Sequence, residues 1–137
     1  MLDRAEFERW RREATAGLTL AGQARQGPSH NWTCFLAEQA AQLAVKALLH
    51  GIGAGPWGHD LIRLGRETSE AVGAPLPPEV SNALARLAKL YIPTRYPDAH
   101  PEGSPGERYT PDEADRALAD ARLVISTVDD LWRQLQT

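Results

Sequence analysis

The feature that most constrains the fold is a helix start followed by an uninterrupted helical repeat at the end of the sequence. Thr110 suits the N-cap, Pro111 suits the first turn, and Glu113 completes a capping box. Apolar residues then recur every three or four positions to the C-terminus: Ala114, Ala117, Leu118, Ala121, Val124, Ile125, Val128, Leu131, Trp132 and Leu135. No segment shows the clean period-two alternation typical of strands. The sequence therefore predicts an all-α protein.

Four further helices are predicted upstream, separated by glycine- and proline-rich turns. They run from about Asp3 to Gln23, Asn31 to His50, Gly58 to Ala71, and Pro78 to Tyr91. The connections are mostly short, which favours a five-helix, mostly antiparallel up-and-down bundle. A length of 137 residues fits one domain covering the whole chain, 1–137.

Composition narrows the class of protein. The net charge of −3 argues against a general nucleic-acid coat protein, which would be basic. The single cysteine, Cys34, excludes an internal disulfide and fits a reducing compartment. No apolar run approaches the roughly 18 residues that a membrane span needs, and the N-terminus has no signal pattern. We therefore expect a cytoplasmic protein that does not associate with membranes.

Two sequence patterns suggest sites that their context does not support. The stretch from Gly53 to Gly58 matches G-x-G-x-x-G, but it follows a helix and not a strand, which excludes a dinucleotide fingerprint. His30 and His50 flank the second helix and are too isolated to form a metal site. Directly after Gly58, His59 and Asp60 are either a proton-handling pair or an ordinary helix start, and the helix start is favoured. We expect no metal and no cofactor.

The strongest candidate site lies in the proline-rich loop formed by residues 92–109. Arg95 and His100 are five positions apart in it. Arginine is a permanent cation whose planar fork binds phosphate, and histidine moves protons near neutral pH. The alternative is that Arg95 pairs with Asp98 or Glu102, and that His100 points into solvent.

Three other residues are candidates for binding a nucleotide or phosphate. Tyr91 and Tyr96 flank Arg95 and supply aromatic surface. Lys46, one of two lysines, lies in the alanine-rich second helix. Its alternative role is a solvated or snorkelling side chain.

The chain resembles the HEPN domain family, the helical domains of higher eukaryotic and prokaryotic nucleotide-binding proteins. Three segments carry the resemblance, and they occur in the family's order and spacing. The stretch from Cys34 to Leu49 is similar to the family's central helix, and Gly58-His59-Asp60-Leu61 resembles its T-H-D-L segment. The stretch from Tyr91 to Asp98 is similar to the signature that precedes the last helix.

The resemblance implies a helical bundle that forms a homodimer, with the arginine–histidine motif near a shared cleft. Many members are metal-independent ribonucleases in which an arginine is followed, a few residues later, by a histidine. Arg95 and His100 match that pattern: Arg95 would hold the scissile phosphate, and His100 would act as general base or acid. Other members bind nucleotides without cleaving RNA, or act as partners of a nucleotidyltransferase encoded nearby.

Two positions decide between these activities. Nuclease members usually have a small polar residue after the arginine, where this chain has Tyr96. Toxin members commonly have a tyrosine two positions after the histidine, where this chain has Glu102. We therefore expect a nucleotide-binding module that works with a nucleotidyltransferase. A toxin-like metal-independent ribonuclease using Arg95 and His100, and a non-catalytic structural homodimer, are the alternatives.

Overall fold

The computed structural model describes all residues from 1 to 137, and it contains helices but no strands. The elements are α1 (Arg4–Ala24), α2 (His30–Ile52), α3 (Leu61–Val72), α4 (Pro78–Ala88) and α5 (Pro111–Leu135), with short 3-10 turns η1 (Pro97–Ala99) and η2 (Pro105–Glu107) between α4 and α5. The predicted all-α bundle of five helices is confirmed.

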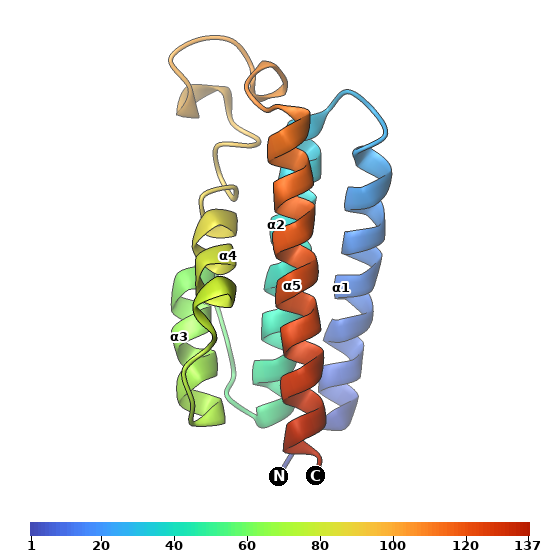
Figure 1. Cartoon of the computed structure of the whole chain (residues 1–137), viewed down its shortest axis with the longest axis vertical. Helices are drawn as coiled ribbons and strands as arrows, with labels where there is room; N and C mark the ends of the chain where they lie inside the picture. The colour runs from blue at the N-terminus through green and yellow to red at the C-terminus, as the bar shows by residue number, and fades with distance from the viewer.

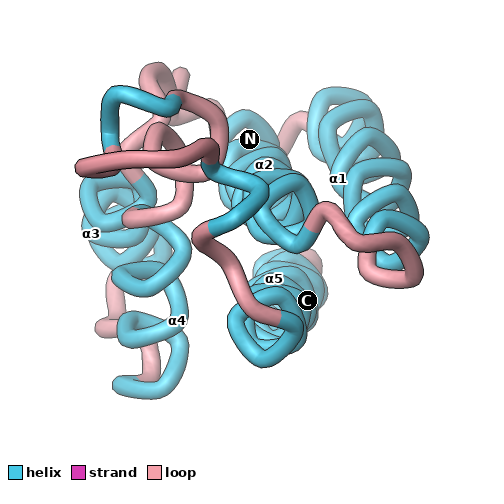
Figure 2. The backbone as a smooth tube through the Cα atoms, turned by 90° about the horizontal axis from the view of Figure 1, so that it is seen from above, coloured by secondary structure: helices cyan, strands magenta, loops and turns pink.

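The helices are arranged around a central pair formed by α2 and α5. Figures 1 and 2 show α1 on one side of this pair and the α3–α4 hairpin on the other. The pairs α1–α2, α3–α4 and α4–α5 run antiparallel, whereas α2 and α5 run in the same direction (Figure 1). The segment 89–110 rises above α4 and crosses to the start of α5, at the end of the bundle opposite both termini (Figure 1).

Helix starts follow the predicted caps. Asp3 Oδ1 accepts a hydrogen bond from the Glu6 backbone N–H at 3.0 Å. At α5 the capping box is complete, because Thr110 Oγ1 accepts from the Glu113 N–H at 3.1 Å and the Glu113 carboxylate accepts from the Thr110 N–H at 3.0 Å. Local sequence therefore decides where these two helices begin.

The third and fourth helices are shorter than predicted. α3 begins at Leu61 and not at Gly58, because Asp60 is the N-cap and its Oδ1 accepts from the Ile62 N–H at 3.0 Å. α4 ends at Ala88, before the predicted end at Tyr91. Pro93 would in any case stop the helix at Ile92, since proline disfavours helical backbone in the residue before it. Tyr91 lies in a bend beyond the helix end.

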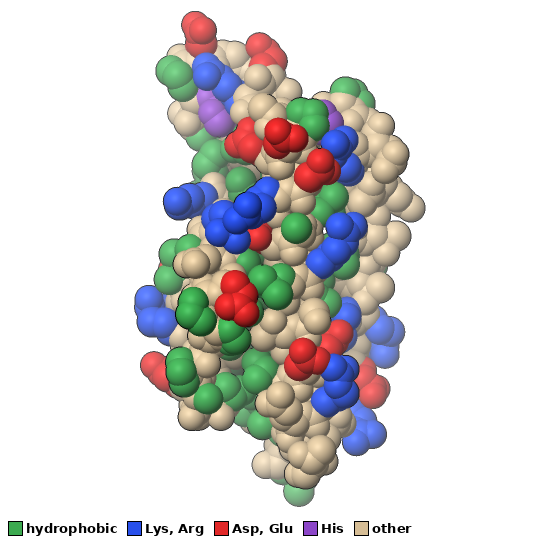
Figure 3. All heavy atoms as spheres, viewed as in Figure 1, with side chains coloured by type: hydrophobic (Ala, Val, Ile, Leu, Met, Phe, Trp, Pro, Cys, Tyr) green, Lys and Arg blue, Asp and Glu red, His purple; other side chains and the backbone are tan.

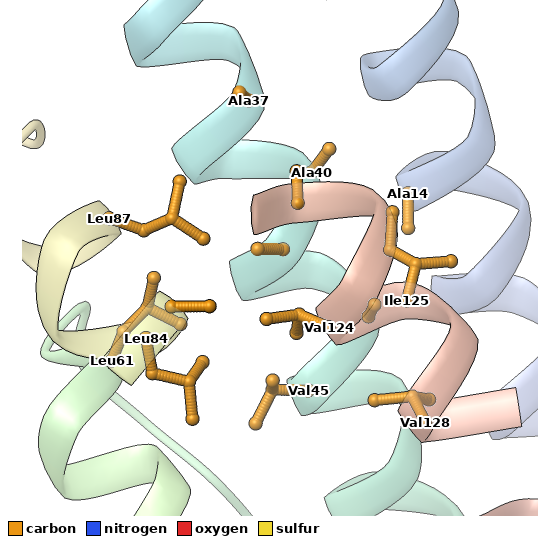
Figure 4. Packing of buried hydrophobic residues seen from close by; sticks show 14 of the residues in the cluster. Ala14, Ala37, Ala40, Val45, Leu61, Leu84, Leu87, Val124, Ile125 and Val128 are labelled. Atoms are coloured by element: carbon orange, nitrogen blue, oxygen red, sulfur yellow. The ribbon is translucent and has the colours of Figure 1, made fainter. Parts of the chain in front are cut away.

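The core is centred on α2, whose alanines allow its neighbours to approach closely. Ala37, Ala40, Ala41, Ala44 and Ala47 are all fully buried. A Cβ placed on Gly17 of α1 would lie 3.5 Å from the Cβ of Ala40, which shows how closely α1 packs on α2 at this point. Figure 4 shows larger side chains from α2, α3, α4 and α5 filling the remaining space.

Cys34 belongs to this apolar core. It is fully buried, and burial is the main cause that raises the pKa of its thiol to about 12. The thiol is therefore unreactive near neutral pH, as expected for a small buried hydrophobe. None of the helices combines the length and apolar character required to cross a membrane.

Candidate functional site

The loop that follows α4 is fixed to the start of α2. Thr94 is fully buried, and its hydroxyl donates to the carbonyl oxygen of Leu90 at 2.6 Å. The side-chain amide of Asn31 in α2 donates to the carbonyl oxygen of Thr94 at 2.9 Å. These two bonds hold the residues on either side of Thr94 in a defined position on the bundle.

Arg95 is held in one orientation by its own loop. Its Nε and Nη2 both donate to the carbonyl oxygen of Tyr91, at 2.9 and 2.6 Å. The guanidinium carbon lies 4.3 Å from the ring centre of Phe35, 4.6 Å from that of Tyr91 and 5.0 Å from that of Tyr96. We call these three rings the aromatic cage. A cation over aromatic faces is attracted to them, so the cage fixes the plane of the guanidinium.

Arg95 has no carboxylate partner. Neither Asp98 nor Glu102 pairs with it, so the alternative expected from the sequence is wrong on this point. Five arginines are partly buried, and the other four each have a carboxylate oxygen at 2.6 to 3.5 Å: Arg11, Arg25, Arg63 and Arg86. Arg95 thus keeps an uncompensated cation at a half-buried position, and three of its five N–H groups make no bond within the protein.

A buried carboxyl group lies near this cation without pairing with it. Glu38 of α2 is fully buried, and its carboxylate accepts from Gln39 Nε2 at 2.7 Å and from Gln42 Nε2 at 2.8 Å. Burial raises the pKa of Glu38, while the two glutamines and the charges of Arg95 and Lys46 oppose that shift. Glu38 is therefore a deeply buried acid that lies near two cations, Arg95 and Lys46, without forming an ion pair with either.

Lys46 is half-buried on α2, and no carboxylate lies within ion-pairing distance of it. Burial and the charge of Arg63 lower the pKa of Lys46, and Glu38 raises it. Lys46 and Arg95 thus both lower the pKa of Glu38, although no contact joins their two side chains.

His100 is tied to the backbone and does not point freely into solvent. Its Nε2 lies 2.6 Å from the carbonyl oxygen of Pro93. Because a carbonyl oxygen can only accept, Nε2 carries the hydrogen, and in the neutral ring the lone pair is on Nδ1. The ring meets the edge of Tyr109 at 6.1 Å between centres. No hydrogen bond joins His100 to Arg95.

An open pocket of about 530 Å³ lies beside the cage, where the end of α4 meets the start of α3. It is lined by His59, Asp60, Ala88, Lys89, Tyr91, Ile92 and Pro93. The ring of His59 stacks on Tyr91, with 4.0 Å between centres and 12° between planes. Tyr91 therefore connects the pocket to the cage that holds Arg95.

Sequence reasoning assigned some of these residues and missed others. Asp60 caps α3, as the sequence predicts, and the ring of His59 stacks on Tyr91 beside the candidate site. Phe35, Glu38 and Gln42 were not predicted as site residues. The available signal was Glu38, an acidic residue on a face of the second helix that also includes the apolar residues Cys34 and Ala41.

The matching family and known structures agree with this architecture. The HEPN domain model matches residues 7–131. The crystal structure of TT1696 from Thermus thermophilus is 36% identical, with a TM-score of 0.87, and the match covers 91% of this chain and 97% of that chain.

Two further solved structures are also similar to this chain in sequence and in fold. ST0689, described as an archaeal HEPN homologue, is 32% identical with a TM-score of 0.76, and 90% of this chain and 95% of that chain are covered. The HEPN domain protein TM0613 from Thermotoga maritima is 31% identical with a TM-score of 0.74, and 91% of this chain and 98% of that chain are covered. No curated protein sequence matches the chain.

Proposed function

We propose that this chain, which belongs to the HEPN domain family, is a nucleotide-binding module that works with a nucleotidyltransferase partner. The observation that carries the proposal is the state of Arg95: half-buried, held rigidly by the aromatic cage, and without a carboxylate partner. Its free N–H groups are suited to a phosphate group, which accepts several charge-assisted hydrogen bonds at once.

A pocket beside the aromatic cage favours a small ligand; Arg95 does not line this pocket itself, and Tyr91 belongs to both the pocket wall and the cage. A pocket of about 530 Å³ is within the range common for small-molecule sites. Its walls combine the apolar side chains of Ala88, Ile92 and Pro93 with the polar groups of His59, Lys89 and Asp60. On the face shown in Figure 3, basic and acidic side chains are interspersed, so that face offers no continuous basic surface for a long nucleic acid.

Calorimetry with ATP, ADP and AMP tests the ligand. Arg95→Ala should weaken binding by roughly a hundredfold, since a charge-assisted hydrogen-bonding group is lost. Arg122→Ala is the matched control, because Arg122 is an exposed arginine with no ion pair, and it should bind as the wild type does. No heat and no thermal shift with any nucleotide, or unchanged binding by Arg95→Ala, would contradict the proposal.

The partner is tested separately. A nucleotidyltransferase encoded by a neighbouring gene should co-purify with this chain when the two are expressed together. Failure of such a pair to associate would remove the partner from the proposal without affecting nucleotide binding.

Ribonuclease activity is a second candidate, and one observation favours it. The bond from Nε2 to Pro93 leaves Nδ1 of neutral His100 able to accept a proton, as a general base must. The ribonuclease hypothesis predicts RNA cleavage in EDTA that disappears in Arg95→Ala and His100→Ala. Intact RNA with the wild-type chain would exclude it.

A homodimer is the arrangement we propose for either activity. Trp32 of α2 is 46% exposed and meets the edge of Phe35 at 6.0 Å between ring centres, so the aromatic surface continues outward from the cage. Leu36 and Leu43 of the same helix are also only partly buried. Light scattering should show a dimer that Trp32→Asp converts to a monomer, and a wild-type monomer at high concentration would refute this arrangement.

A further inference from the structure

Glu38 is an acidic residue buried inside the helical bundle. Its side chain is fully buried in the central helix, where Cys34 and Ala41, one turn away on either side, are buried and apolar. Transferring a carboxyl group out of water costs free energy that an apolar side chain would not lose. Because burial of this carboxyl group is costly, its hydrogen-bond partners indicate the role that Glu38 has in the protein.

The first link from Glu38 leads to the loop before α3. Gln42 Nε2 donates to Glu38 Oε2 at 2.8 Å and, with its second N–H, to the carbonyl oxygen of His59 at 3.4 Å. Gln42 is itself only 8% exposed, so its amide has few other orientations. The carboxyl group of Glu38 thus fixes the amide that contacts the backbone of His59.

The second link leads from His59 to Arg95. The imidazole of His59 stacks on Tyr91 at 4.0 Å, and the carbonyl oxygen of Tyr91 accepts both hydrogen bonds that orient Arg95. The path from Glu38 to the guanidinium consists of a hydrogen bond from Gln42, a hydrogen bond from Gln42 to the backbone of His59, the stacking of the His59 ring on Tyr91, and two hydrogen bonds from Arg95 to the Tyr91 carbonyl oxygen.

Gln39 provides an internal comparison. Its Nε2 donates to the other oxygen of the same carboxyl group, Glu38 Oε1, at 2.7 Å. Gln39 makes no hydrogen bond onward to the loop. Two glutamines thus satisfy one carboxyl group, but only Gln42 connects it to the site.

We propose that Glu38 and Gln42 are positioning residues that set the orientation of Arg95 through His59 and Tyr91. Neither side chain touches the ligand in this arrangement. The effect on ligand affinity rests on the proposed nucleotide-binding function. The effect on the orientation of Arg95 does not, because that orientation is a property of the free protein.

The test measures the Nε–H resonance of Arg95 by NMR and the affinity for ATP by calorimetry. Because the guanidinium lies close to the rings of Phe35 and Tyr91, this resonance in the wild type should differ from that of an exposed arginine. Gln42→Leu should move it toward the position of an exposed arginine and weaken ATP binding by about tenfold, as when a group that orients a binding residue is removed. Gln39→Leu should leave both unchanged.

Two further variants separate positioning from folding. Glu38→Gln keeps an oxygen that accepts from Gln42, so the Arg95 resonance should stay at its wild-type position. Glu38→Leu removes that oxygen, so the resonance should move as it does in Gln42→Leu. His59→Ala removes an exposed side chain, so it interrupts the chain of contacts without disturbing the core, and it should shift the resonance as Gln42→Leu does.

An Arg95 resonance that is unchanged in both Gln42→Leu and His59→Ala would overturn the proposal, and so would an equal shift in Gln39→Leu. If wild-type protein binds no nucleotide, the proposed function fails, but the resonance still decides whether Glu38 and Gln42 position Arg95.

Discussion

Two arginines on either side of the end of α4 have opposite environments. Arg86 binds Asp120 of α5 through two hydrogen bonds of 2.9 Å, and Asp120 is only 4% exposed. Arg95 is held by a carbonyl oxygen and aromatic rings that leave its charge uncompensated. The comparison shows that neutral groups can orient an arginine by two hydrogen bonds, as a carboxylate can. Only the neutral groups leave its charge available to a ligand.

The largest expected effect on stability is that of Asp120→Ala. Asp120 accepts from Arg86 and also lies 3.4 Å from Arg116, so its removal leaves two cations without a partner where α4 packs on α5. Thermal unfolding should show a decrease of several degrees. Asp130→Ala, which removes an exposed pair with Arg133, is the control and should change the unfolding temperature little.

The next effect tests how the loop containing Arg95 is anchored. Asn31→Ala removes the amide that donates to Thr94 and leaves a carbonyl oxygen at a buried residue without a partner. The free energy of unfolding should fall by about 1–2 kcal/mol. Limited proteolysis should then cut the segment 92–109 sooner than in the wild type, and an unchanged digestion pattern would indicate that other contacts suffice.

Glu38→Gln should produce a smaller effect that depends on pH. Because burial raises the pKa of Glu38, the folded protein holds the proton more tightly than the unfolded chain. The contribution of Glu38 to the free energy of unfolding of the wild type is therefore fully present below its ordinary pKa of 4.5. It is lost as the pH rises through the higher pKa of the folded protein.

Glutamine cannot ionise, so the variant should gain stability relative to the wild type over this range. Urea unfolding of both proteins at about pH 4 and about pH 8 measures the difference. A difference that stays constant with pH would mean that the folded pKa of Glu38 is not raised.

Arg95→Leu should change stability least and function most. The interaction of the guanidinium with the cage is worth about 1 kcal/mol, and leucine recovers part of it by apolar contact with the rings. The unfolding temperature should therefore stay close to that of the wild type while ATP affinity falls. Arg86→Leu should do the reverse, and equal effects of the two variants would remove the contrast between these arginines.

Much of the candidate site could be predicted from the sequence, but its arrangement could not. The proline-rich loop, Arg95, His100 and the flanking tyrosines are visible because prolines mark loops and these residue types carry recognisable chemistry. Phe35, Glu38 and Gln42 could not be assigned, since each is an ordinary helix residue until the loop packs against it. The end of α4 could not be predicted from the sequence either. Apolar residues keep their helical spacing to Tyr91, although the helix ends at Ala88.

The sequence by itself determined the five helices, their caps at Asp3 and Thr110, and the buried alanine face of α2. Caps and periodicity depend on residues within a few positions of one another, so local chemistry is sufficient for them. Only the tertiary structure decided that Arg95 has no carboxylate partner and that Glu38 reaches it through Gln42, His59 and Tyr91. Those relations join α2, the loop before α3 and the turn after α4, and such distant segments become neighbours only when the bundle has formed.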